Sequence, residues 1–181
     1  MIIQTGMRTD IPAFYSKWFL NRIKEGYVLV RNPYNERQVT RYRLAPDVVD
    51  LIAFCTKNPT PMLPYMNVLK SYGKYWFVTI TPYGRDIEPN VPDKEKVMDD
   101  LKKLSDIVGV DSMGWRYDPI LVDDKHSVEW HITEFEKMAE NMKKHNPMSP
   151  FLLGESMPGD VIHEAKQESW IAYQLRLGTL I

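Results

Sequence analysis

Cysteine is almost absent from this chain: its 181 residues include one, Cys55. A single cysteine excludes an internal disulfide, which needs two thiols. It also excludes a metal or iron–sulfur site built only from cysteines, because such sites use several thiolates. Long apolar runs are missing too, since no stretch approaches the ~18 residues of a membrane-spanning helix. Arg8 and Asp10 come before any long apolar segment, so we expect a cytoplasmic protein with no signal peptide and no membrane partner.

An excess of charge of one sign is also missing. The chain has 23 Lys and Arg against 24 Asp and Glu, a formal net charge of -1. Domains that bind nucleic acids usually carry a clear basic excess, so we expect no nucleic-acid partner. Hydrophobic residues make up 44% and aromatic residues 12% of the sequence, which supports a packed core and excludes a disordered chain.

Short apolar runs alternate with amphipathic segments over most of the chain. The predicted strands are residues 1–3, 27–30, 51–55, 75–80 and 112–115. The predicted helices begin after Asp10, near Met62, after Asp93 and after Ser127, and the first three end at Gly26, Gly73 and Gly109. This alternation predicts an α/β fold of parallel (β/α) repeats. Because a complete TIM barrel needs ~250 residues, we expect a partial TIM-like barrel of about five units.

The regular alternation of predicted strands and helices ends near residue 145. The clusters Asn146–Pro150 and Met157–Gly159 are rich in helix-breaking residues, and one more helix is predicted between Asp160 and Leu175. We therefore divide the chain into residues 1–144, the N-terminal part of the TIM-like barrel, and residues 145–181, a divergent and helical tail with little contact to the barrel core.

Cationic side chains follow four of the apolar runs: Arg8, Arg31, Lys57 and Arg116. If the strands are parallel neighbours, these groups converge on one rim, where they would bind a carboxylate or phosphate. The sequence thus predicts a pocket for an anionic small molecule. Its candidate substrate-binding residues are Arg8, Arg31, Asn32, Lys57, Asn58, Thr81, Tyr83, Arg116, Tyr117 and Asp118. In this hypothesis Asp118 holds Arg116, while Tyr83 and Tyr117 orient the substrate.

Ordinary structural roles compete with this interpretation at each position, since proline ends strands, asparagine forms turns and aspartate caps helices. Asp10 is fully explained as an N-cap, so capping is favoured over catalysis there. The four cations together favour a site, because turns do not require cations. No metal site is expected, since no H-x-x-x-H or H-E-x-x-H spacing occurs. Tyr15, Trp18, Trp76 and Trp130 fall at spacings that predict core packing.

Five motifs in order carry a resemblance to a known family. They are R-T-D-I-P-A at 8–13, G-Y-V-L-V-R-N-P at 26–33, T-K-N-P at 56–59, T-P-Y-G at 81–84 and W-R-Y-D-P-I at 115–120. Over about residues 1–142 the sequence resembles the bacterial domain of unknown function 1848 family. The resemblance implies a TIM-like barrel related to the radical-SAM superfamily. It also implies that full-length relatives carry a C-terminal cysteine cluster resembling an iron–sulfur motif, with S-adenosylmethionine as a second cofactor.

The sequence departs from the family pattern in three places. Met7 and Cys55 stand where the family usually has an arginine and an aromatic residue, and the cysteine cluster is missing. We therefore expect no cofactor in this chain, which would be a truncated product or a divergent form.

Two functions remain open. The first is the N-terminal portion of a radical-SAM-like enzyme barrel that keeps an anion pocket without the iron–sulfur motif. The second is a non-catalytic binding module whose open barrel edge is covered by a partner chain or by a second copy of itself.

Overall fold

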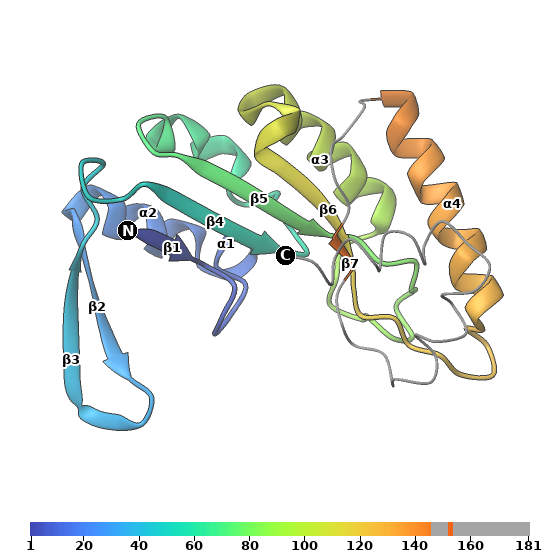
Figure 1. Ribbon diagram of the computed structural model, residues 1–181, viewed down its shortest axis with the longest axis horizontal. Coiled ribbons are helices and arrows are strands. Elements are labelled where there is room, and N and C mark those ends of the chain that lie inside the picture. Colours follow the sequence, from blue (N-terminus) through green and yellow to red (C-terminus); the bar gives the residue numbers. More distant parts are fainter. Residues whose placement is uncertain (146–151, 154–181) are drawn as a thin grey trace. The chain divides into compact units, whose positions relative to one another are not determined.

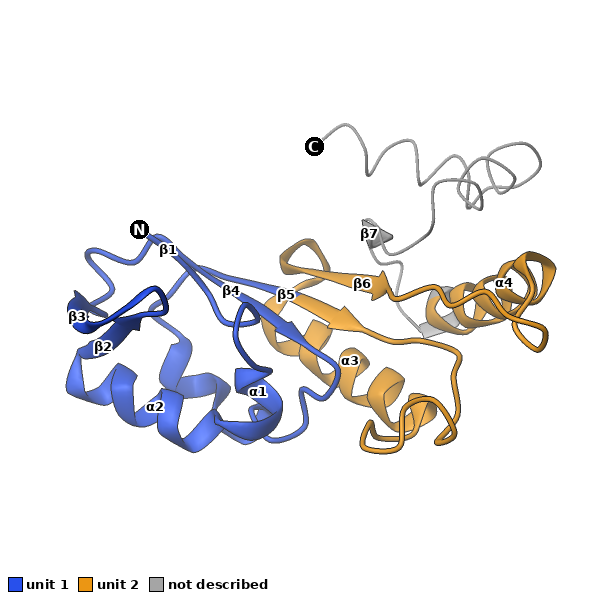
Figure 2. Ribbon diagram, turned by 90° about the horizontal axis from the view of Figure 1, so that it is seen from below, with its two compact units in different colours: residues 1–76 blue, residues 77–181 orange. Residues whose placement is uncertain are grey.

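The computed structural model describes residues 1–145 and 152–153, and the chain divides into two compact units, Met1–Trp76 and Phe77–Ile181 (Figure 2). The strands of the principal sheet are, in order, β1 (Ile2–Gln4), β4 (Leu51–Thr56), β5 (Lys74–Thr79), β6 (Met113–Tyr117) and β7 (Leu152–Leu153). The first four strands are parallel, which confirms the predicted α/β class. The described residues form an open sheet rather than a closed barrel.

In the first unit, β1 leads into two short helices, α1 (Ile11–Phe14) and α2 (Ser16–Glu25), where the sequence predicts one. The helix is interrupted at Tyr15, whose φ of -128° and ψ of 21° lie outside the helical region. As predicted, Asp10 caps α1 and Gly26, with a φ of 73°, ends α2.

The interruption at Tyr15 changes which side chains face the core. The buried side chains of α2 are Ser16, Phe19, Leu20 and Ile23. Tyr15 and Trp18 are instead 49% and 46% exposed. The predicted core role of these two aromatic residues is therefore wrong, whereas Trp76 is fully buried as predicted.

Residues 27–43 form an antiparallel hairpin of β2 (Tyr27–Asn32) and β3 (Asn35–Arg43), drawn in blue in Figure 1. The prediction of residues 27–30 as a buried strand of the parallel sheet is wrong, because β2 pairs with β3 in a separate two-stranded sheet. The turn forms locally: Asn32 Oδ1 accepts a hydrogen bond from Tyr34 N at 2.9 Å. Arg31 and Asn32 consequently lie near the hairpin turn and not at a carboxyl-end rim of the sheet.

β4 lies beside β1 in parallel register, with Ile2 opposite Leu51 and Gln4 opposite Ala53. Phe54 of β4 stacks its ring on that of Trp76 in β5, at a centroid distance of 4.1 Å. The connection from β4 to β5 contains a 3-10 helix, η1 (Leu63–Leu69), where the sequence predicts a helix ending at Gly73. A glycine is required at 73, because a Cβ atom there would lie 2.3 Å from the backbone oxygen of Asp50.

In the second unit, α3 (Lys94–Val108) follows β5, a short 3-10 helix η2 (Val110–Ser112) precedes β6, and α4 (Val128–His145) follows β6. Asp93 and Ser127 precede α3 and α4 as predicted. Trp115 of β6 organises the core, since its ring stacks on Phe135 at 4.9 Å and its Nε1 donates to the Ile80 carbonyl oxygen at 2.9 Å.

Two residues of the predicted tail, Leu152–Leu153, form the parallel strand β7, with Leu152 opposite Arg116 of β6. The tail prediction for residues 146–151 and 154–181 lies outside the described residues. No helix in the described part of the chain is both long and apolar enough to cross a membrane.

Candidate functional site

The first unit contains a cavity of about 480 Å³, formed by the segment after β1, by α2 and by β2. Its volume lies within the ~300–1,000 Å³ typical of small-molecule sites. Apolar side chains form most of the wall, among them Ile3, Phe19, Val28, Leu29, Val30 and Leu44. Arg8, Arg22 and Arg31 also line it, and no acidic residue does. The cavity therefore combines an apolar body with positive charge.

Within the described part of the chain, none of these three arginines forms an ion pair with a carboxylate. Arg8 donates from Nη2 to the Arg31 carbonyl oxygen at 3.2 Å, which draws the segment after β1 toward the hairpin. Arg22 lies with its Cζ 5.8 Å from the centroid of the Tyr27 ring, and its buried Nε has no acceptor in the described part of the chain. A buried donor without an acceptor costs about 1–3 kcal/mol, so a ligand that supplied one would relieve that cost.

Asp10 is fully engaged nearby at the end of β4. Its Oδ1 accepts from Ala13 N, and its Oδ2 accepts from both Thr56 Oγ1 and Lys57 N, each at 2.9 Å. The carboxylate thus caps α1 and ties that helix to the end of β4. This confirms capping as the role of Asp10.

Lys57 and Asn58 belong to the turn that follows β4. The Asn58 N–H donates to Thr56 Oγ1 at 2.9 Å, and Asn58 Oδ1 accepts from Thr60 N at 3.3 Å. Among the predicted site residues of the first unit, Arg8 and Arg31 line the cavity. The others, Asn32, Lys57 and Asn58, are not among its lining residues.

In the second unit, Tyr83 and Tyr117 hold the loop after β6. The Tyr83 hydroxyl donates to Pro119 O at 2.9 Å and accepts from Leu121 N at 2.6 Å. The Tyr117 hydroxyl lies 2.8 Å from His131 Nδ1, and His131 Nε2 lies 2.8 Å from Leu121 O. Since a carbonyl oxygen only accepts, Nε2 carries the proton and Nδ1 accepts from Tyr117.

Burial keeps this pair of side chains neutral. It raises the pKa of the Tyr117 hydroxyl and lowers the pKa of the His131 imidazole. The hydroxyl groups of Tyr83 and Tyr117 thus form hydrogen bonds within the protein, and these bonds hold the loop after β6.

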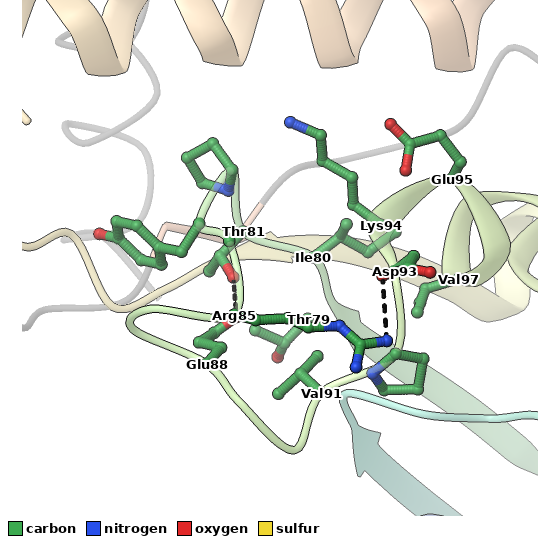
Figure 3. Close-up of a pocket in the computed structure, with 14 residues that line it drawn as sticks. Thr79, Ile80, Thr81, Arg85, Glu88, Val91, Asp93, Lys94, Glu95 and Val97 are labelled. Carbon is green, nitrogen blue, oxygen red and sulfur yellow. Dashed lines mark hydrogen bonds and ion pairs between the residues drawn. The ribbon is translucent and has the colours of Figure 1, made fainter.

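Around the other predicted residues of this unit, positive and negative side chains occur together. Arg116 forms the expected ion pair with Asp118. Thr81 and Tyr83 line a smaller pocket of about 190 Å³. Figure 3 shows Thr81 bonded to Glu88, at 2.6 Å, and an ion pair of 3.6 Å between other lining residues, Arg85 and Asp93. Because its wall holds both signs, this pocket does not select an anion.

The residues present do not fit an iron–sulfur cluster. The sequence holds one cysteine, and a Cβ atom on Gly6 would lie 2.6 Å from the Cβ of that residue, Cys55, so the two backbones are closely packed. Within residues 1–145 and 152–153, no group of three or more His, Cys, Asp or Glu side chains is placed to hold a metal ion.

Sequence reasoning missed most residues of the larger cavity, and three of these bear on its chemistry: Tyr15, Trp18 and Arg22. Trp18 and Arg22 lie one turn apart on α2, and Tyr15 is the residue directly before this helix. An arginine within an aromatic helical stripe was the available signal, because a buried stripe rarely includes an unpaired cation.

Comparison with known proteins gives one family match. The model described as Domain of unknown function (DUF1848) matches residues 2–151, which include all five motifs and the larger cavity. No curated protein and no solved structure matches the chain.

Proposed function

The chain belongs to the DUF1848 family, and from that premise we propose that its first unit binds an anionic small molecule in the cavity lined by Arg8, Arg22 and Arg31. The observation that carries the proposal is the charge of the lining residues, which include three arginines and no aspartate or glutamate. An anion would offset their mutual repulsion and accept charge-assisted hydrogen bonds worth about 1.5–3 kcal/mol each.

We also propose that this cavity belongs to a partial TIM-like barrel related to the radical-SAM superfamily, as the family resemblance implies. The parallel pairing of β1 and β4 supports the barrel part of this hypothesis. The radical-SAM part rests on the resemblance. In an enzyme of this kind, the arginines would bind and orient the substrate.

Calorimetric titration with octanoate and its neutral counterpart octan-1-ol tests the proposal. We expect octanoate to bind at least tenfold more tightly than the alcohol. Arg22→Gln and Arg31→Gln should each weaken octanoate binding by roughly tenfold, since tenfold corresponds to about 1.4 kcal/mol. Arg37→Gln is the matched control, because Arg37 is exposed on β3 and does not line the cavity.

Three results would refute anion binding at this cavity. They are the absence of octanoate binding, equal affinity for acid and alcohol, and a loss in Arg37→Gln as large as in Arg31→Gln.

One observation favours the second candidate function, an interaction module. β1 is the first strand in the sheet order, and Ile2 on it is 68% exposed. An exposed edge strand with an apolar side chain is a surface on which another chain can pair. If a second copy covers this edge, sedimentation velocity should show a concentration-dependent dimer that Ile2→Lys abolishes. A native chain that stays monomeric up to the highest soluble concentration contradicts self-association.

A further inference from the structure

The cavity of the first unit carries aromatic side chains that the protein does not pack. Tyr15 and Trp18 both line it and remain about half exposed. Neither ring stacks on another ring among the residues that the structure describes. Large aromatic rings in water forgo part of the hydrophobic stabilisation that burial gives, so these two rings form an available surface.

The same side of α2 carries a cation. Arg22 follows Trp18 by one turn of α2, and Tyr15 directly precedes this helix. All three residues line the cavity and together form a stripe along it. Phe19, which also lines the cavity, is 4% exposed and supplies a fixed apolar wall behind this stripe. Arg8 and Arg31 line the cavity from the segment after β1 and from β2. Flat apolar surface and positive charge are thus combined in one cavity.

We infer that the ligand is an aromatic anion, a planar aryl or heteroaryl ring that carries a carboxylate or a phosphate. This inference rests on the proposed function, because it names the class of anion that the cavity takes. A ring can stack face to face on Trp18, while its acidic group accepts from the arginines. An alkyl anion of equal hydrophobicity satisfies the charge but gains no stacking. A neutral ring stacks but leaves the guanidinium groups without a counter-charge.

The test compares two carboxylates of similar hydrophobicity, 2-naphthoate and octanoate, by calorimetry and by quenching of tryptophan fluorescence. We expect the native chain to bind 2-naphthoate about tenfold more tightly than octanoate. Trp18→Leu should weaken 2-naphthoate binding about tenfold and change octanoate binding less than twofold, since stacking is worth roughly that factor. Trp18→Phe should restore most of the affinity.

A matched control and a second variant separate stacking from folding. Tyr34→Leu alters an aromatic residue that is 97% exposed and does not line the cavity, so neither affinity should change. If Trp18→Leu loses its native circular dichroism spectrum, Tyr15→Leu is measured instead, with the same selective loss expected.

The outcomes distinguish the two proposals. Equal affinity for both carboxylates, or an equal loss of both in Trp18→Leu, overturns the aromatic inference and leaves anion binding intact. If the neutral 2-naphthalenemethanol binds as tightly as 2-naphthoate, anion recognition is overturned and with it this inference. If neither carboxylate binds, both proposals are overturned.

Discussion

Replacing Asp10 by alanine should destabilise the first unit by about 3 kcal/mol. The carboxylate caps α1 through Ala13 N, and losing an N-cap costs about 1 kcal/mol. It also accepts from Thr56 Oγ1 and Lys57 N, and each lost bond to a partly buried group costs roughly another 1 kcal/mol. With a urea m-value of about 2 kcal/mol/M, the unfolding midpoint should fall by about 1.5 M.

Two further variants show whether Asp10 acts through the end of β4. Asp10→Asn keeps one acceptor oxygen but turns an amide donor toward the remaining N–H or O–H group, so about half of the loss is expected. Thr56→Val removes one donor to Asp10 and also the acceptor of Asn58 N. A double-mutant cycle between Asp10→Ala and Thr56→Val should give a coupling of about 1 kcal/mol, because the two side chains touch.

The control for the Asp10 series is Asp47→Ala. Asp47 pairs with Arg43 at 2.6 Å, but both side chains are exposed, so the loss should stay within about 0.5 kcal/mol. Urea unfolding followed by circular dichroism measures all of these variants. If Asp10→Ala costs no more than Asp47→Ala, or if the cycle shows no coupling, the assignment of Asp10 as the tie between α1 and β4 is refuted.

Two other predictions concern stability. Burial lowers the pKa of His131 below its usual value of about 6.5, so the unfolded chain binds a proton that the folded chain does not. The unfolding free energy should therefore be highest above about pH 6.5 and should fall as the pH is lowered toward 5. In His131→Gln the free energy should depend less steeply on pH, and equal pH dependence in the two proteins contradicts this. Gly73→Ala should cost about 3 kcal/mol, because its Cβ would meet the Asp50 oxygen. Gly26→Ala, strained only by its φ of 73°, should cost about 1 kcal/mol; equal urea midpoints contradict this.

The parts of the fold that could be predicted depend on short-range signals. The strands at 51–55 and 75–80 are short runs of mostly apolar residues bounded by turn residues. Asp10 and Gly26 mark helix ends through their own chemistry, an acceptor for free N–H groups and a tolerated positive φ. Each of these strands and helix ends is determined by a few neighbouring residues, so no long-range contact is needed to predict it.

The hairpin at residues 27–43 could not be predicted in this way. The apolar run 27–30 has the composition of a parallel strand, and its pairing partner follows a two-residue turn, Pro33–Tyr34, that lacks the usual Asn-Gly or Gly-rich signal. The choice between a strand of the parallel sheet and a hairpin is therefore not encoded in the run itself. Arg8 and Arg31 still share one site, but they do so because Arg8 reaches the hairpin backbone, not because two parallel strands end at one rim.

The aromatic stripe of α2 shows why a candidate site was harder to predict than a core. A period of 3.6 residues identifies one side of a helix as apolar, and it cannot tell whether protein or ligand will cover that side. The interruption at Tyr15 separates α1 from α2, so the buried face of α2 includes Ser16 and Phe19, and Trp18 lies beside that face. Arg22 shows that the residues beside the buried face do not belong to the core. An arginine whose guanidinium has no carboxylate partner is not tolerated inside a packed core. In an amphipathic helix, the apolar residues adjoining such a cation are those to test first for ligand binding.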